Sequence, residues 1–318
     1  MGAMGGVVVL CSLVIFSLSS LGHGLSLNYY DKTCPQAEAI ITNVVKKAVM
    51  ADKKVPAALL RMHFHDCFIR GCDGSVLLNS VGQNTAEKDG PPNRSLHAYY
   101  VIDSAKTQVE KVCPGVVSCA DVLALAARDV VVQAGGPYWQ VPKGRLDGRI
   151  SRASETRLLP SPAFNFSQLL QSFSQRGLSG ADLVALSGGH TLGFSHCSSF
   201  QNRIRNFDAN HDVDPTLNPS FAGSLKNICP AVNAAKNAGS NMDSSPATFD
   251  NTYYKLLIQR KSLFSSDQAL LSTSETKSLV YKFASSHKAF TDAFAKSMIK
   301  MSSLTGGQEV RLECSKAN

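Results

Sequence analysis

Apolar residues recur every three to four positions along most of the chain, which is the spacing of one buried face of an α-helix. This pattern predicts helices over residues 37–50, 57–68, 166–176, 252–259 and 283–301. Runs that alternate between apolar and polar residues, as in a half-buried strand, are few and short. We therefore predict a mainly α fold.

End signals predict another buried helix near the middle of the chain. Ser118 and Asp121 form a capping-box pattern, in which the first side chain caps the helix start and the second lies one turn later. An apolar run follows as far as Val132, and the Gly-Gly-Pro of residues 135–137 ends it.

A second capped helix is predicted just before a histidine. Ser179 and Asp182 mark its start, an apolar run follows over residues 183–186, and the glycines of residues 188–189 end it. His190 comes next, so we expect its side chain at the C-terminal end of this helix.

The first 24 residues have the pattern of a secretory signal peptide. Residues 7–21 are apolar and almost uncharged, which is too short for a comfortable membrane span but suits the central region of a signal peptide. We expect cleavage near residue 24, leaving residues 25–318 as the mature protein. No later segment approaches ~18 consecutive apolar residues, so we expect no membrane anchor after cleavage.

Composition narrows the class of protein. The chain has 318 residues, 44% hydrophobic and 18% charged, so it can bury a large core and is not a disordered protein. Its net charge is +8, with an isoelectric point near 9.0. The positive residues form no block interleaved with aromatics, so no nucleic-acid interface is indicated, and an acidic polysaccharide is an equally suitable partner for the basic surface.

The cysteine count agrees with secretion. One of the nine cysteines, Cys11, lies in the leader, which leaves eight in the mature chain. An even number in a secreted protein predicts disulfides, here four, although spacing alone leaves 105 possible connectivities.

The richest chemical motif is the Arg-Met-His-Phe-His-Asp-Cys stretch of residues 61–67. On a helix, Arg61 and His65 lie four residues apart and share a face, whereas His63 points elsewhere. A guanidinium beside an imidazole favours the neutral base, and it can stabilise negative charge that develops on a reactant. The motif therefore fits acid–base catalysis, but taken alone it fits a structural ion pair equally well.

Oxygen ligands for a hard cation follow directly. Asp66, Asp73 and Ser75, with the carbonyls of Ile69 and Gly71, can form a calcium shell. Cys67 and Cys72 could close a short ring around these ligands. A solvated loop is the alternative reading.

Several motifs, in the same order, resemble those of the class III secretory plant peroxidases. They include residues 61–68, Arg-Met-His-Phe-His-Asp-Cys-Phe, and residues 186–193, Leu-Ser-Gly-Gly-His-Thr-Leu-Gly. Shorter matches occur at residues 28–35, 117–121, 135–137, 249–254 and 266–268, so that the resemblance covers almost the whole mature chain.

The resemblance implies one non-covalent haem b between two lobes of a plant-type haem peroxidase fold. The distal lobe is expected over about 25–155 and the proximal lobe over about 156–290, with the C-terminal helix returning to the distal lobe. His190 is implied as the axial ligand of the iron, with Asp267 as its hydrogen-bond partner. No Cys-x-x-Cys-His motif for covalent attachment is present.

On the opposite face of the haem, the resemblance implies that His65 and Arg61 cleave hydrogen peroxide through a ferryl intermediate. Asn93 is implied to orient His65, and Phe64 to shield the site. Phenolic or similar donors are then oxidised in one-electron steps near the carbonyl of Pro160. Where some family members carry aromatic residues near the donor, this chain has Pro91, Ala163 and Ser199.

The resemblance also implies two calcium ions and a set of four disulfides. The distal calcium ligands are Asp66, Ile69, Gly71, Asp73 and Ser75, with Glu87 linked through water, and the proximal ligands are Thr191, Asp243, Ser245, Thr248 and Asp250. The implied disulfides are Cys34–Cys113, Cys67–Cys72, Cys119–Cys314 and Cys197–Cys229. Asp121 and Arg145 are implied as a buried ion pair.

By the same resemblance, the protein is expected in the apoplast or cell wall, as a monomer. Asn93 and Asn165 each begin a glycosylation sequon. If Asn93 orients His65 it is buried, and Asn165 is then the better candidate for a glycan.

Two other functional classes remain open from the sequence. A secreted metallohydrolase would bind zinc through His63, His65 and Asp66, although a helix directs the two histidines to different faces. A catalytically silent wall-binding protein would use only the basic surface, and the presence of Arg61, His65 and His190 argues against it.

Overall fold

The structure is a computed structural model that describes residues 24–230 and 237–318. The predicted signal peptide therefore lies, apart from its last residue, outside the described residues. Within the described part of the chain, no helix is both long and apolar enough to span a bilayer.

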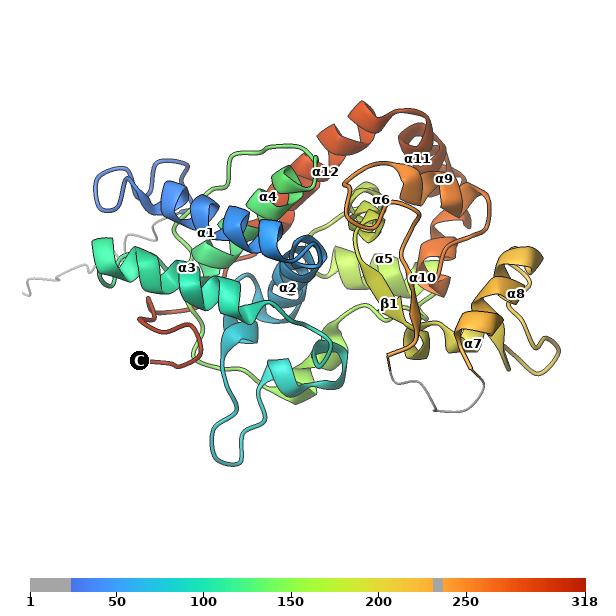
Figure 1. Cartoon of the computed structure of the whole chain (residues 1–318), viewed down its shortest axis with the longest axis horizontal. Coiled ribbons are helices and arrows are strands. Elements are labelled where there is room, and N and C mark those ends of the chain that lie inside the picture. Colours follow the sequence, from blue (N-terminus) through green and yellow to red (C-terminus); the bar gives the residue numbers. More distant parts are fainter. Residues whose placement is uncertain (1–23, 231–236) are drawn as a thin grey trace, which may run out of the picture.

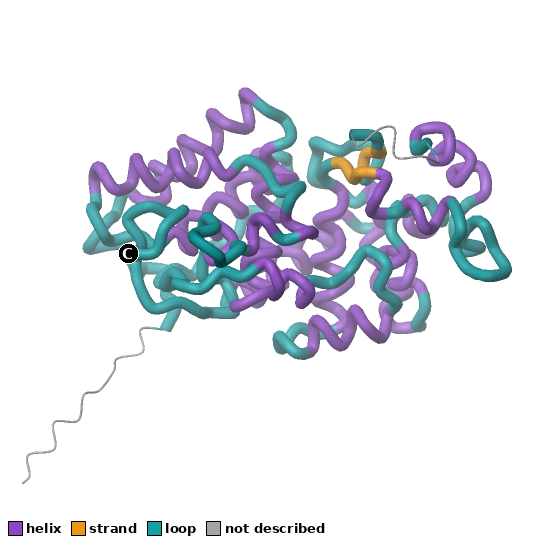
Figure 2. Tube along the Cα trace, turned by 90° about the horizontal axis from the view of Figure 1, so that it is seen from below, coloured by secondary structure: helices purple, strands orange, loops and turns teal. Residues whose placement is uncertain are grey.

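The predicted mainly α fold is confirmed (Figure 1). Figure 2 shows how little of the chain is strand. One group of helices comprises α1 (Ala37–Ala51), α2 (Val55–Arg70), α3 (Tyr99–Val112) and α4 (Cys119–Gln133). The second comprises α5 (Phe166–Ser174), α6 (Gly180–Ser187), α7 (Gln201–Ile204), α8 (Pro219–Ile228), α9 (Thr252–Ile258), α10 (Ser265–Gln268), α11 (Ser274–Ser285) and α12 (His287–Ser302). Strands β1 (Phe194–His196) and β2 (Gly239–Asn241) pair antiparallel, with Ser195 opposite Ser240.

The two helix starts predicted from capping signals are confirmed. The Ser118 hydroxyl accepts a hydrogen bond from the Asp121 backbone N–H at 3.1 Å and begins α4. Ser179 and Asp182 form a full capping box at the start of α6. After α6, a 3₁₀ turn over Gly188–Thr191 carries His190, so this histidine does lie at a helix end.

Helix α2 runs through the centre of the molecule, beside the α1, α3 and α4 group and close to α5 and α6 (Figure 1). Its residues are buried on almost every side, so it lacks a polar face. Pro56 suits the first turn because that turn needs no amide donor, and Gly71 ends the helix with a φ of 87°. A central buried helix gives its side chains little freedom, which suits the support of a reactive site.

The single helix predicted over residues 283–301 is wrong. The chain breaks at Ser286, whose backbone is extended (φ −139°, ψ 102°) and whose hydroxyl accepts from the Ala289 N–H to begin α12. The apolar spacing continues across this break because α11 and α12 both turn apolar faces to one core. Helices α3, α7, α8, α10 and most of α11 were not predicted.

Two hydrophobic clusters hold the helices together. The larger contains residues from α1 to α6 and from α9, α11 and α12, and includes a group of aromatic rings around Phe290 and Phe294. The smaller lies around α7 and α8, where Phe200, Ile204 and Leu225 are buried.

The C-terminal tail returns to the first group of helices, where Figure 1 shows its end beside α3. Cys119–Cys314 fixes it to the start of α4. The other three disulfides are Cys34–Cys113, Cys67–Cys72 and Cys197–Cys229, so all four pairs are those implied by the resemblance. Asp121 and Arg145 form the expected ion pair, fully buried, at 2.8 Å.

Candidate functional site

The first half of the site is a histidine fixed by an amide. Helix α2 carries His65, which is 6% exposed, and the loop before α3 carries Asn93. The Nδ1 of His65 lies 2.5 Å from the Asn93 Oδ1. An amide oxygen only accepts, so Nδ1 carries the proton and Nε2 is left as a free base.

The environment keeps this imidazole neutral. Burial, and then the nearby charge of Arg61, lower the pKa of His65 to about 3, against the opposing effect of the Asn93 hydrogen bond. Both effects disfavour the protonated ring. His65 is therefore available as a base throughout the neutral and mildly acidic range.

Arg61 lies one turn before His65, as the helical spacing predicts. Its two terminal nitrogens donate to the Ser95 Oγ at 2.9 Å and to the Pro92 carbonyl at 2.8 Å. The loop of Asn93 thus holds both Arg61 and His65. Phe64 packs edge-to-face on His65, with ring centres 5.7 Å apart.

The second half of the site is a histidine fixed by a carboxylate. The Nδ1 of His190 lies 2.8 Å from the Oδ1 of Asp267, a residue of α10 that is 2% exposed. The rings of Tyr253 and Phe264 stand edge-on to the imidazole, with centres 5.9 Å and 5.3 Å away. This side chain remains 42% exposed despite these neighbours.

The two halves are joined by α2. A Cβ added to Gly193 would come within 2.7 Å of the Ala57 Cβ, and one added to Gly189 would lie 3.5 Å from Leu60. The first turns of α2 therefore pack directly on the His190 segment. One turn later, the same helix carries Arg61 and His65.

These residues fit the haem that the resemblance implies. Within the described residues, Nε2 of His65 and Nε2 of His190 form no hydrogen bond, while both Nδ1 atoms are fixed. An imidazole whose second nitrogen is hydrogen-bonded to a carboxylate is the usual form of a metal-ligating histidine. The two free nitrogens suit an iron ligand on one side and a base on the other.

His63 takes no part in this pairing. It is fully buried, its Nε2 lies 2.7 Å from the Ser302 hydroxyl, and its ring lies against the Cys67 sulfur. Burial and the charge of Arg145 lower its pKa to about 3. Because His65 contacts Asn93, and Asp66 accepts from the amides of a different loop, the three zinc ligands of the metallohydrolase hypothesis do not converge.

Three buried carboxylates gather around the C-terminal end of α2, with Asp66 on the helix itself. Asp66 accepts from the Gly74 amide at 2.9 Å, Asp73 from the Ser75 amide at 3.0 Å, and Glu87 from the Ser75 hydroxyl at 3.3 Å. Burial, followed by repulsion from Asp66 and Asp73, raises the pKa of Glu87 to about 9. Its second oxygen is buried without a partner among the described residues. Such a cluster fits a hard cation, which would neutralise it.

A second oxygen-rich group lies beside His190. The Thr191 hydroxyl donates to Asp243 at 2.6 Å, and the Ser245 hydroxyl donates to Asp250 at 2.9 Å. Burial, followed by the neighbouring Asp250, raises the pKa of Asp243. Thr248 belongs to the same turn, since its amide donates to the Ser245 carbonyl at 2.8 Å.

The remaining predicted positions are placed as follows. Pro160 is half-buried between a 3₁₀ turn (Ala153–Leu158) and α5, and no described residue donates to its carbonyl. Asn93 is 1% exposed, while Asn165 is exposed at the start of α5, where its side chain caps the helix.

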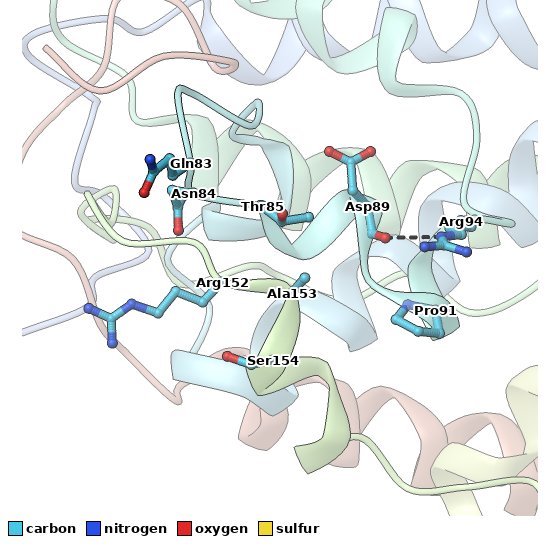
Figure 3. Close-up of a pocket in the computed structure, with 9 residues that line it drawn as sticks. All are labelled: Gln83, Asn84, Thr85, Asp89, Pro91, Arg94, Arg152, Ala153 and Ser154. Carbon is cyan, nitrogen blue, oxygen red and sulfur yellow. Dashed lines mark hydrogen bonds between the residues drawn. The ribbon is translucent and has the colours of Figure 1, made fainter.

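A surface hollow of about 400 Å³ lies beside the loop of Asn93 (Figure 3). Arg152 extends from one end of it, and Arg94 lies at the other, where its Nε donates to the Asp89 carbonyl. Neither histidine lines this hollow. Its lining residues are Gln83, Asn84, Thr85, Asp89, Pro91, Arg94, Arg152, Ala153 and Ser154.

Sequence reasoning missed two groups around the site. It assigned no role to Tyr253, whose hydroxyl donates to Asp267 at 2.9 Å. It also assigned no role to Ser95 and the Pro92 carbonyl, which hold Arg61. No local pattern signals these contacts, because each joins segments that are distant in the sequence.

Comparison with known proteins agrees with this geometry. The sequence pattern of the peroxidase family matches residues 41–286. The chain is 67% identical to Peroxidase 64 of Arabidopsis thaliana over 303 residues, covering 95% of this chain and 96% of the relative. It is 59% identical to Peroxidase 66 of the same plant (87% and 86% covered) and 43% identical to Peroxidase 1 of Oryza sativa subsp. japonica (99% and 100% covered). The chain therefore belongs to the peroxidase family, among the class III plant peroxidases.

Proposed function

We propose that this haem peroxidase reduces hydrogen peroxide with His65 as the acid–base group, Arg61 as the charge-stabilising group and His190 as the ligand of the iron. The observation that carries the proposal is the pair of histidines with fixed Nδ1 and free Nε2 atoms, one beside an amide and the other beside a carboxylate. The haem supplies the redox-active iron at which the peroxide is reduced.

His65 performs the proton transfer. Its neutral Nε2 accepts the proton of the first peroxide oxygen and returns it to the second oxygen, which leaves as water. The amide of Asn93 keeps Nδ1 protonated, so that the basic nitrogen faces the substrate. The guanidinium of Arg61 stabilises the negative charge that develops as the O–O bond breaks.

His190 performs the complementary task. Its bond to Asp267 fixes the ring and makes the imidazole a stronger electron donor. A stronger donor favours the more oxidised states of the metal it binds, and those states are the ones a peroxidase needs.

Small phenolic donors are proposed to bind near Pro160 and to give up one electron each. Support comes from the free carbonyl of Pro160, which can accept a phenolic O–H. Pro91, Ala163 and Ser199 provide no aromatic face, so stacking on them does not select the donor.

Two calcium ions are proposed to brace the two histidines. The distal ion is held by Asp66, Asp73 and Ser75, with the carbonyls of Ile69 and Gly71, and is linked to Glu87. The proximal ion is held by Thr191, Asp243, Ser245, Thr248 and Asp250. The raised pKa values of Asp66 and Glu87 support the distal site, because burial without a cation disfavours their ionised forms. At the proximal site the pKa of Asp243 is raised in the same way, whereas hydrogen bonds lower that of Asp250.

Secretion to the apoplast or cell wall is proposed from the leader and the four disulfides. We also propose a glycan on Asn165, which is exposed, and none on Asn93, which is buried against His65.

The test is a visible absorption spectrum and metal analysis of the purified, calcium-supplied protein, with His190→Ala as the control. We expect a Soret band and about one iron per chain in the native protein, a spectral change with one equivalent of hydrogen peroxide, and recovery on adding a phenol. His190→Ala should lose the band or the response. Zinc in place of iron, or a haem band inert to peroxide, would contradict the proposal.

A further inference from the structure

One oxygen of Asp267 accepts two hydrogen bonds. The Nδ1 of His190 lies 2.8 Å from the Oδ1, and the hydroxyl of Tyr253 donates to the same Oδ1 at 2.9 Å. The other oxygen, Oδ2, accepts a longer bond from the Phe264 amide at 3.2 Å. The atom that fixes His190 is therefore shared with a phenol.

The fold holds this phenol in place. Tyr253 belongs to α9 and is 3% exposed, and its ring is packed edge-to-face on Tyr254, with ring centres 4.9 Å apart. Its ring also stands edge-on to His190, at 5.9 Å. Because an ionised carboxylate only accepts hydrogen bonds, the phenol is the donor of this pair.

A carboxylate that accepts a second hydrogen bond is a weaker acceptor for the first. Each donor withdraws electron density from the oxygen and lowers its basicity. The Nδ1 proton of His190 is then drawn less strongly towards Asp267, and the imidazole gains less anionic character.

We propose that Tyr253 is a positioning residue of the proximal site that limits the electron donation of His190 by sharing the Asp267 oxygen. This inference rests on the proposed role of His190 as the iron ligand. It adds a third member to the His190–Asp267 pair, contributed by a separate helix.

The test is resonance Raman spectroscopy of the reduced, haem-loaded protein, which reports the stretching frequency of the bond between iron and histidine. Tyr253→Phe keeps the ring and removes the hydroxyl. We expect the frequency to rise and the equilibrium for reduction of the iron to become roughly two- to tenfold less favourable, the change expected from one net hydrogen bond. Replacing Tyr253 with 3-fluorotyrosine, which is a stronger donor of similar size, should shift both quantities in the opposite direction.

Tyr254→Phe is the matched control. Tyr254 is also buried, but its hydroxyl donates to the Val184 carbonyl at 2.8 Å and not to Asp267. Removing it should leave the frequency and the reduction equilibrium unchanged.

Asp267→Asn separates failure of this inference from failure of the proposed function. The role of Tyr253 is overturned if Asp267→Asn lowers the frequency while both changes at Tyr253 leave it unchanged. It is also overturned if Tyr253→Phe lowers the frequency. In both cases the proposed role of His190 stands. If Asp267→Asn also has no effect, Asp267 does not tune the iron ligand, and both the role of Tyr253 and the proposed pairing of His190 with Asp267 are overturned.

Discussion

The two histidines of this peroxidase are held in similar ways but by groups of different charge. In each, Nδ1 is bonded to an acceptor from another segment, and Nε2 has no hydrogen-bond partner in residues 24–230 and 237–318. The acceptor is the neutral amide of Asn93 for His65 and the carboxylate of Asp267 for His190. His65 is nearly buried, whereas the His190 side chain is 42% exposed.

The difference shows how one residue type can serve two tasks. An amide fixes the tautomer, and its hydrogen bond favours the protonated ring too weakly to outweigh burial and the charge of Arg61, so His65 remains available as a base. A carboxylate draws the Nδ1 proton and leaves more electron density on the ring, which suits His190 to the proposed role of iron ligand. In the proposed function, the acceptor at Nδ1 therefore distinguishes the role of each histidine.

The largest effect is expected from removing the base. His65→Ala should slow the reaction with hydrogen peroxide by about 10²–10⁴-fold, because the proton relay is lost, and should leave haem binding intact. Stopped-flow absorption at the Soret band measures this rate. A rate close to that of the native protein would show that another group transfers the proton.

A smaller but more specific effect is expected from exchanging the acceptor. Asn93→Asp would place a carboxylate on His65, as on His190, and an adjacent negative charge raises an imidazole pKa by roughly one to three units. The fall of the peroxide rate in acid should then set in at a pH roughly one to three units higher than in the native protein, with recovery as the pH rises. Asn93→Ala is the control, since it removes the acceptor without adding charge. If Asn93→Asp has the same pH profile as the native protein, the charge of the acceptor at Nδ1 does not determine whether His65 acts as a base.

Removing calcium should destabilise the protein most at high pH. Burial raises the pKa of Asp66, Asp73 and Glu87, in Glu87 from 4.5 to about 9. Between pH 4.5 and about 9, Glu87 of the calcium-free folded protein keeps a proton that the unfolded chain has released. The free energy of unfolding of the calcium-free protein therefore falls as the pH rises. Chelation should therefore lower Tm by roughly 5 °C or more at pH 8, and by less at pH 5. Equal losses at both pH values, measured by calorimetry after verified calcium removal, would contradict the proposed distal site.

The smallest effect on chemistry is expected at the neighbouring histidine. His63→Leu removes the bond to the Ser302 hydroxyl and should cost about 1–3 kcal/mol of stability, since a buried hydroxyl loses its partner. The peroxide rate should stay within about twofold of the native rate, because His63 does not face Asn93 or Arg61. A denaturant melt and the same stopped-flow measurement check both statements. A large loss of rate in a stable variant would mean that the wrong histidine of the motif has been assigned.

Much of the fold could be predicted from local signals. Ser118 and Ser179 begin their helices as predicted, because capping depends on residues within one turn. The break at Ser286 was missed, because the apolar spacing runs on through it and only the extended backbone of one residue separates α11 from α12.

Some contacts of the candidate site could be predicted from local sequence, others only from the family resemblance, and one from neither. The pairing of Arg61 with His65 follows from helical spacing, but the partners Asn93 and Asp267 came only from the resemblance to a family, since each lies far from its histidine in the sequence. The four disulfide pairs came from the same resemblance. Tyr253 could not be found in this way, because its role depends on a bond between α9 and α10 that forms only in the folded chain.

The most direct test of the central claim is the pH profile of the reaction between the haem-loaded native protein and hydrogen peroxide, followed by stopped-flow absorption. Because the pKa of His65 is lowered to about 3, the rate should be constant from neutral pH into mild acid and fall only when the pH approaches that value. A rate that halves near pH 6.5, the usual pKa of histidine, would show that His65 is not held as a neutral base and would contradict the account.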